Sequence, residues 1–135
     1  MKQVVAGLIV RGDEILICQR AEDGPMPLKW EFPGGKIEPQ ELAKDALRRE
    51  LEEELGIQTK IGVRVAIIRH GYPEGTAVEL HFYVIEHYEG EIQNRIFHDV
   101  RWVSRKELPS YDFLEADIVL IRDLASGKLT LTAGS

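Results

Sequence analysis

The chain has 135 residues, of which 44% are hydrophobic and 30% are charged, and its formal net charge is −6 at pH 7. This balance is typical of a soluble globular protein, and the length predicts a single domain over residues 1–135. The negative charge argues against binding of a nucleic-acid duplex, which depends on clustered Lys and Arg side chains. It does not exclude nucleotides, because metal ions can hold their phosphates. No signal-peptide pattern follows Met1 and no apolar run approaches the ~20 residues of a membrane helix, so we expect a cytoplasmic protein without membrane contact.

The first part of the chain predicts a β-hairpin. Two apolar segments, residues 4–10 and 14–20, flank a short break that contains a glycine. The only cysteine, Cys18, lies in the second apolar segment, which favours a buried structural thiol. Arg20 ends this strand, where it either reaches a ligand or lies in solvent. Residues 21–29 contain Gly and Pro without periodicity and predict a loop.

Residues 30–57, WEFPGGKIEPQELAKDALRRELEEELGI, contain a short extended segment, a Gly-Gly turn and a helix. We expect the helix to begin near Pro39, which suits a first helical position, and to end at Leu55 before a glycine. Glu50, Glu53 and Glu54 then share one helix face. Like charges this close destabilise a helix by a few tenths of a kcal/mol per pair, roughly, unless a cation lies among them. The pattern indicates a divalent-metal site, with an ordinary solvated acidic face as the alternative.

The second half of the chain predicts a long antiparallel hairpin, formed by residues 59–70 and 76–88, and a short strand at residues 100–103. After this strand, Ser104 begins a capping-box pattern for a brief helical turn that Pro109 stops.

A last helix is expected over residues 114–125, with one apolar face formed by Leu114, Ile118, Ile121 and Ala125. The tail from Ser126 has no predicted partner. The order of elements predicts an α/β/α layered domain with a mixed central sheet.

The spacing of residues in the central stretch resembles the Nudix box. Gly35, then Glu41 after five intervening residues, then residues 49–57 (RELEEELGI) after seven more, match every defined position of that motif. The order of strands along the rest of the chain is also similar to the Nudix fold. The resemblance implies a Nudix-type α/β/α sandwich and hydrolysis of a nucleoside diphosphate linked to another group.

The resemblance also implies Mg²⁺ or Mn²⁺ as cofactor. Carboxylate and carbonyl oxygens suit Mg²⁺, and the implied metal ligands are Gly35, Glu50, Glu53 and Glu54. The implied catalytic residues are Glu50, Glu53 and Arg49.

Glu50 is the first choice for the general base, while Arg49 and Glu41 are expected to hold the loop and the helix together and to orient Glu50. Some relatives place a glutamate in the loop before the strand that begins here at Val100. In this chain that loop contains His98 and Asp99, which are the alternative bases.

Within the family, the segment WEFPGGK and the small size resemble the MutT-type nucleoside triphosphate pyrophosphohydrolases, which act on 8-oxo-dGTP, CTP or modified pyrimidine nucleotides. By this resemblance Arg20 would contact phosphate, Phe32 would line the base pocket and Asp117 would read the base edge. The bacterial 8-oxo-dGTP enzyme has an amide at the position of Asp117, and an ionised Asp only accepts hydrogen bonds. The substrate therefore stays open. The alternative role for Asp117 is an acid in the first turn of a helix, favoured by the helix dipole.

The leading hypothesis is hydrolysis of a nucleoside triphosphate to the monophosphate and pyrophosphate, in nucleotide-pool sanitisation, by a monomer or homodimer. One alternative is an ADP-ribose or dinucleoside polyphosphate pyrophosphatase, for which Pro73 in the hairpin turn is a weak marker. Another is a non-catalytic nucleotide-binding module. The module is disfavoured because the chain keeps every carboxylate of the box.

Overall fold

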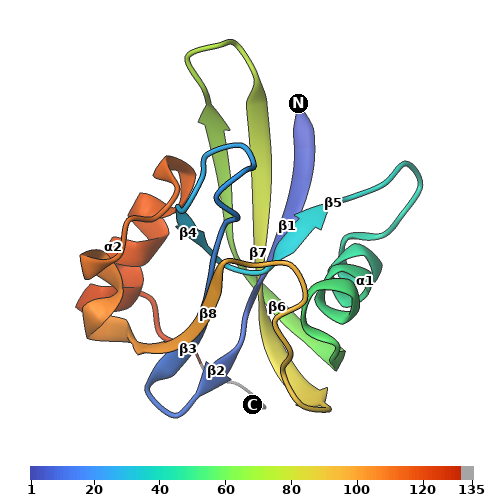
Figure 1. Cartoon of the computed structure of the whole chain (residues 1–135), viewed down its shortest axis with the longest axis vertical. Helices are drawn as coiled ribbons and strands as arrows, with labels where there is room; N and C mark the ends of the chain where they lie inside the picture. The colour runs from blue at the N-terminus through green and yellow to red at the C-terminus, as the bar shows by residue number, and fades with distance from the viewer. Residues whose placement is uncertain (132–135) are drawn as a thin grey trace.

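The computed structural model describes residues 1–131, within which two α-helices lie on opposite sides of two β-sheets (Figure 1). The first sheet has the strand order β5-β1-β7-β6. Its strands are β1 (Lys2–Leu8), β5 (Gly34–Lys36), β6 (Gln58–Gly71) and β7 (Ala77–Glu89). β1 runs parallel to β7, whereas the β1–β5 and β6–β7 pairs are antiparallel. The predicted mixed sheet and the long hairpin are therefore confirmed.

The second sheet is antiparallel and is centred on β3 (Glu14–Gln19), which pairs with three other strands. These are β2 (Val10–Arg11), β4 (Trp30–Glu31) and β8 (Asp99–Ser104). The predicted hairpin of residues 4–10 and 14–20 is confirmed only at its turn, where β2 pairs with β3, because residues 2–8 form β1 in the first sheet. The hydrogen bonding thus divides the strands between two sheets, a division that the strand pattern in the sequence does not reveal.

Helix α1 (Ala43–Leu55) ends as predicted, with Gly56 in a left-handed conformation at φ 70°. The predicted start at Pro39 is wrong. Gln40 has a φ of 66°, which breaks the helical backbone, and the residue before α1 makes no side-chain cap. Residues 38–41 form a turn instead, in which Glu41 accepts a hydrogen bond from the Glu38 backbone N–H at 3.0 Å. This turn leaves the Glu41 carboxylate beside α1 instead of within it.

The core lies on both faces of the first sheet. Successive residues of β1 point to opposite faces, so Val5 packs on the α1 side while Ala6 and Leu8 pack on the other side. On the α1 side the apolar stripe of the helix is completely buried, and its residues are Leu47, Leu51 and Leu55. Cys18 is also buried, as predicted. Its thiol pKa is raised, by burial first and then by the charges of Glu54 and Glu31.

A short 3-10 helix, η1 (Arg105–Ser110), follows β8. The predicted helical turn is confirmed, but Ser104 makes no capping hydrogen bond, and Pro109 lies inside the turn instead of stopping it.

The last predicted helix is divided into η2 (Glu115–Asp117) and α2 (Ile118–Ser126). The tighter 3-10 turn changes the phase of the helix, so the predicted face is partly wrong: Ile118 is 38% exposed, and the buried face consists of Leu120, Ile121 and Leu124.

The tail is packed up to residue 131, because Leu129 and Leu131 contact the core. Residues 132–135 of the predicted tail lie outside the described residues. No helix among residues 1–131 combines the length and the apolar character needed to cross a membrane.

Candidate active site

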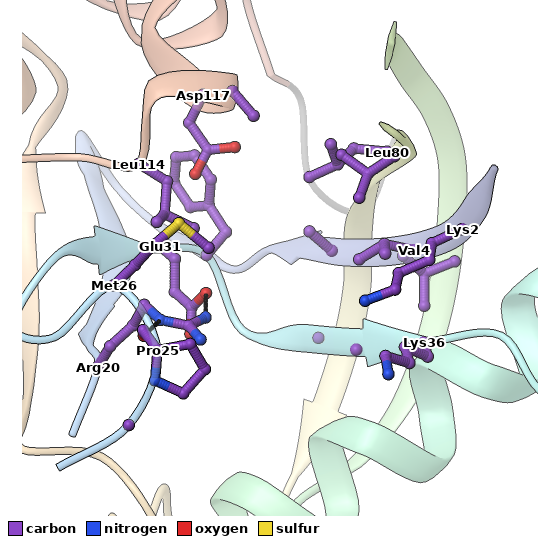
Figure 2. A pocket seen from close by; sticks show the side chains of 18 of the residues that line it. Lys2, Val4, Arg20, Pro25, Met26, Glu31, Lys36, Leu80, Leu114 and Asp117 are labelled. Atoms are coloured by element: carbon purple, nitrogen blue, oxygen red, sulfur yellow. Dashed lines mark hydrogen bonds and ion pairs between the residues drawn. The ribbon is translucent and has the colours of Figure 1, made fainter. Parts of the chain in front are cut away.

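A cavity of about 860 Å³ brings together residues that are far apart in the sequence (Figure 2). Strands β1, β5 and β7 line one part of it, and the loop after β3, strand β4 and η2 line another. The volume lies within the range of small-molecule sites. Five residues singled out from the sequence line this cavity: Arg20, Phe32, Gly35, Glu54 and Asp117.

Arg49 of α1 connects three parts of the acidic end of the site. Its Nε and Nη2 each donate a hydrogen bond of 3.0 Å to the Glu41 carboxylate, and its Nη1 donates one of 2.8 Å to Glu50. Nη2 also donates to the Lys36 carbonyl of β5 at 3.2 Å. Binding to Arg49 lowers the pKa of Glu41 and raises that of Arg49 itself. These contacts join the loop to the helix and fix the position of the Glu50 carboxylate, as expected from the sequence for Arg49 and Glu41.

The three helix glutamates have different surroundings. Glu54 is only 6% exposed, and its carboxylate accepts a hydrogen bond of 3.3 Å from the Gly34 N–H. Burial raises the pKa of Glu54 most, and the neighbouring Glu50 carboxylate raises it further. Glu53, in contrast, has a side chain that is 60% exposed and reaches Arg49 at 3.5 Å. The structure thus gathers Glu50 and Glu54, while no group of three or more potential metal-ligating side chains is assembled within residues 1–131.

The surroundings of Glu50 and Glu54 fit a divalent cation. A Cβ added at Gly35 would lie 2.6 and 2.7 Å from the two Glu50 carboxylate oxygens, so only glycine leaves this space open. Two carboxylates that meet in a buried place repel each other unless a proton or a cation lies between them. Their oxygens, with backbone carbonyls nearby, are the donors that Mg²⁺ and Mn²⁺ prefer.

Glu31 of β4 belongs to the site and was missed in the sequence. Its carboxylate binds Arg20 Nη1 at 2.8 Å, and Arg20 Nε donates to the Pro25 carbonyl at 2.9 Å. Burial raises the pKa of Glu31, and the charge of Arg20 opposes this. The available signal was a carboxylate between two aromatic residues, Trp30 and Phe32, that are both buried.

Asp117 lies at the other end of the cavity. It is 2% exposed, and its Oδ1 has no hydrogen-bond partner in the protein. It is the residue directly before α2, as the alternative role of an acid at a helix start requires, but its side chain makes no capping hydrogen bond. Burial and, secondarily, the charge of Glu31 raise the Asp117 pKa to about 8. A neutral carboxylic acid both donates and accepts a hydrogen bond, unlike the ionised form considered from the sequence.

The loop before β8 directs two apolar side chains, Ile96 and Phe97, to the cavity. The Asp99 carboxylate instead accepts hydrogen bonds from the Val100 N–H at 2.8 Å and from Arg101 Nε at 2.7 Å. The His98 backbone is held by Gln19 at 2.9 Å. Neither alternative base is among the residues that line this cavity.

Comparison with known proteins identifies the family. The family model described as NUDIX domain matches residues 1–124, and the chain belongs to the Nudix family. It is 37% identical over 121 residues to the CTP pyrophosphohydrolase of Escherichia coli (strain K12), a match that covers 90% of this chain and 89% of the relative. It is 35% identical over 123 residues to the 8-oxo-dGTP diphosphatase of the same organism, covering 90% and 95% of the two chains.

A solved structure agrees with these matches. The solution structure of the E. coli ORF135 protein has a TM-score of 0.83 and 35% identity, and the match covers 95% of this chain and 91% of that chain. With relatives named as a pyrophosphohydrolase and a diphosphatase, the chain is a Nudix hydrolase.

Proposed function

We propose that this protein hydrolyses a nucleoside triphosphate to the monophosphate and pyrophosphate with the help of Mg²⁺ or Mn²⁺. The observation that carries the proposal is a single cavity lined by Gly35 and Glu54 at one end and by buried Asp117 at the other, with Glu50 directly beside Gly35. Such a cavity can hold a polyphosphate and a base at the same time. The names of two relatives, which refer to CTP and 8-oxo-dGTP, support this substrate class.

Glu50, Glu54 and the Gly35 carbonyl would hold the cation, with Glu53 as a further ligand after release from Arg49. A bound divalent cation neutralises phosphate charge and lowers the pKa of a coordinated water. Glu50 acts as the general base and accepts the proton of the attacking water. Arg49 orients the Glu50 carboxylate through its 2.8 Å hydrogen bond.

Asp117 and Phe32 form the base end of the site. Phe32 is buried and contacts Phe82 and Phe113 edge-on or tilted, which fixes this wall of the cavity. The Asp117 carboxyl group, neutral near pH 7, pairs with a base edge that offers both a donor and an acceptor. These properties support removal of ordinary or oxidised nucleotides from the cytoplasmic pool.

A substrate panel tests the proposal. Purified protein is given CTP, dCTP, 8-oxo-dGTP and ADP-ribose with MgCl₂, with MnCl₂ and with EDTA, and monophosphate, pyrophosphate and orthophosphate are quantified. We expect monophosphate and pyrophosphate in equal amounts from at least one triphosphate, and no product with EDTA. Absence of turnover in every metal condition would refute the proposed reaction, and orthophosphate as the first product would assign a different bond.

A further inference from the structure

The C-terminal end of helix α1 carries an unfavourable charge pattern. Its last turn contains Glu52, Glu53 and Glu54 and no basic residue. The free carbonyl groups at the end of a helix give it a partial negative charge, so acidic side chains destabilise this end and a cation stabilises it. Two glutamates that the proposed metal site uses, Glu53 and Glu54, therefore lie where the helix tolerates negative charge least.

A segment far along the chain brings a cation to this helix end. The loop between β7 and β8 passes beside α1 (Figure 1), and Arg95 in this loop donates a hydrogen bond of 3.1 Å from Nη1 to the Glu52 carbonyl. The same carbonyl accepts the capping hydrogen bond of the Gly56 N–H at 3.0 Å. Arg95 thus places its positive charge on the carbonyl at which the helix ends.

Further hydrogen bonds hold the loop in this position. The Arg95 N–H donates to the Glu54 carbonyl at 3.2 Å, and the Gln93 N–H donates to the Leu55 carbonyl at 2.9 Å. The Gln93 side chain accepts a hydrogen bond of 3.1 Å from Arg95 Nε. Carbonyls in the last turn of a helix have no partner within the helix itself, so the loop supplies partners that the helix cannot.

Gly56 leaves the space that the guanidinium group occupies. A Cβ at this position would lie 2.8 Å from Arg95 Nη2 and 3.0 Å from Arg95 Cζ. The left-handed backbone of Gly56, with φ at 70°, already favours glycine. The position therefore serves both the end of the helix and the close approach of Arg95.

These contacts reach the site through Glu54. Its carbonyl is held by the Arg95 N–H, and its carboxylate accepts a hydrogen bond of 3.3 Å from the Gly34 N–H of β5. The residue after Arg95, Ile96, lines the cavity. The segment around Arg95 thus connects the last turn of the helix to the wall of the cavity.

We propose that Arg95 is a positioning residue of the site, whose cationic side chain fixes the last turn of α1 and with it the geometry in which Glu53 and Glu54 hold a divalent cation. The metal-binding role of these glutamates rests on the proposed function. Arg95 is not among the residues that line the cavity, so it acts through the helix. Groups that orient metal ligands change the affinity for the metal without touching it.

Hydrogen exchange and metal titration of the nucleotide-free protein test this role. Amide exchange is followed by NMR without metal, and Mn²⁺ binding by titration calorimetry, for the wild type, Arg95→Gln and Arg95→Lys. In Arg95→Gln we expect the amides of residues 53–56 to exchange at least about threefold faster, because the helix end loses a charge-assisted hydrogen bond and a favourable charge.

The dissociation constant of Arg95→Gln for Mn²⁺ should rise by about three- to tenfold, less than the loss of a direct hydrogen-bond partner of a metal ligand would cause. Arg95→Lys should recover most of both losses, because lysine keeps the charge and can donate a hydrogen bond.

Arg122→Gln is the matched control. It removes an exposed arginine from α2, which lies on the opposite side of the sheets from α1 (Figure 1), and it should leave both measurements unchanged. The amides in the first half of α1 and in the β6–β7 hairpin are internal controls. A general loss of stability would speed their exchange as well, whereas the proposed role of Arg95 predicts a change confined to the last turn of α1.

The measurements separate the role of Arg95 from the proposed reaction. Unchanged exchange at residues 53–56 in Arg95→Gln, faster exchange throughout the protein, or an unchanged Mn²⁺ affinity would each overturn the role. Equal behaviour of Arg95→Lys and Arg95→Gln would also overturn it, because the charge would then not matter. If the wild type binds no Mn²⁺ while exchange in the last turn depends on Arg95, the proposed metal site is wrong and the contact that stabilises the helix end remains.

Discussion

The acidic end and the base end of the cavity are built in different ways. At the acidic end, the Lys36 carbonyl and the Glu41 and Glu50 carboxylates come from one continuous stretch and accept hydrogen bonds of 2.8–3.2 Å from Arg49. At the base end, Arg20, Glu31 and Asp117 come from the loop after β3, from β4 and from η2. The comparison indicates that the reaction depends on a local unit, while substrate choice depends on contacts between distant segments.

The two ends also differ in the kind of group that would stabilise their buried carboxyl groups. Glu54 is buried beside a second carboxylate, so a cation between the two groups removes their repulsion. Asp117 is buried without a hydrogen-bond partner for Oδ1, so a proton or a donor on the ligand satisfies it. One end is thus suited to a metal ion and the other to a neutral hydrogen-bonding group.

The largest expected effect comes from Glu50→Gln at the acidic end. Removal of the proposed base and metal ligand should reduce kcat on the order of 100- to 1000-fold. The melting temperature should stay equal or rise, because the negative charge beside Glu54 is lost. The change is measured by steady-state kinetics with MgCl₂ and by thermal unfolding. Glu52→Gln, at an exposed position of the same helix, is the matched control and should keep wild-type kinetics. A wild-type kcat for Glu50→Gln would remove Glu50 from the mechanism.

Gly35→Ala should have the next largest effect, because the new methyl group would occupy the space beside Glu50, 2.6 Å from its nearer oxygen. Displacement of Glu50 should lower activity by about 10- to 100-fold, similar to other losses of metal-site orientation. The melting temperature should fall, since overpacking costs about 1–3 kcal/mol. Gly71→Ala meets no atom within 4 Å and serves as the control. Equal activity of the two variants would show that the space beside Glu50 is not needed.

The smallest effect is expected at the base end, from Asp117→Asn. The pKa of Asp117 rises from 3.8 to about 8 on folding. Between these values the folded protein keeps a proton that the unfolded chain has released. The stability contribution of Asp117 is therefore complete below about pH 4 and is lost as the pH rises toward 8.

Asn stays neutral, so Asp117→Asn should be more stable than the wild type at pH 8 by at least about 1 kcal/mol, with little difference at pH 4. Denaturant unfolding at both pH values measures this. The ranking of CTP, dCTP and 8-oxo-dGTP should change between pH 6 and pH 9 in the wild type but not in the variant. Identical pH profiles of the two proteins would mean that the protonation of Asp117 does not affect recognition of the nucleotide base.

The acidic end could be predicted from the sequence because its spacing is local. The helix periodicity placed Leu47, Leu51 and Leu55 in the core, and the glycine pattern located Gly35 and Gly56. The start of α1 could not be predicted in the same way. Its position depends on the left-handed backbone of Gln40 and on the hydrogen bond between Arg49 and Glu41. The preference of proline for a first helical position predicts neither of these features.

The remaining differences come from contacts across the fold. Glu31 was not predicted as a site residue because its place there depends on its ion pair with Arg20 and on its burial, and both arise only in the folded structure. The position of Gly35 opposite Val5 depends on the β1–β5 register, which a single sequence does not specify. The exposure of Ile118 depends on the 3-10 turn before α2, which changes the helical phase that the apolar spacing had predicted.

The parallel pairing of β1 with β7 also has a consequence for the order of folding. It joins Lys2 to Val78 and Leu8 to Val84, so the whole stretch of residues 30–57 lies in the chain loop that this pairing closes. Closing a loop of that length costs chain entropy before any contact is gained, and such non-local pairings form slowly. Helix α1 and the β6–β7 hairpin are formed by contacts between residues close in the sequence, so they can form first during folding. The cavity arises only when the N-terminal strand docks, so the assembly of the binding site is coupled to the slowest step of folding.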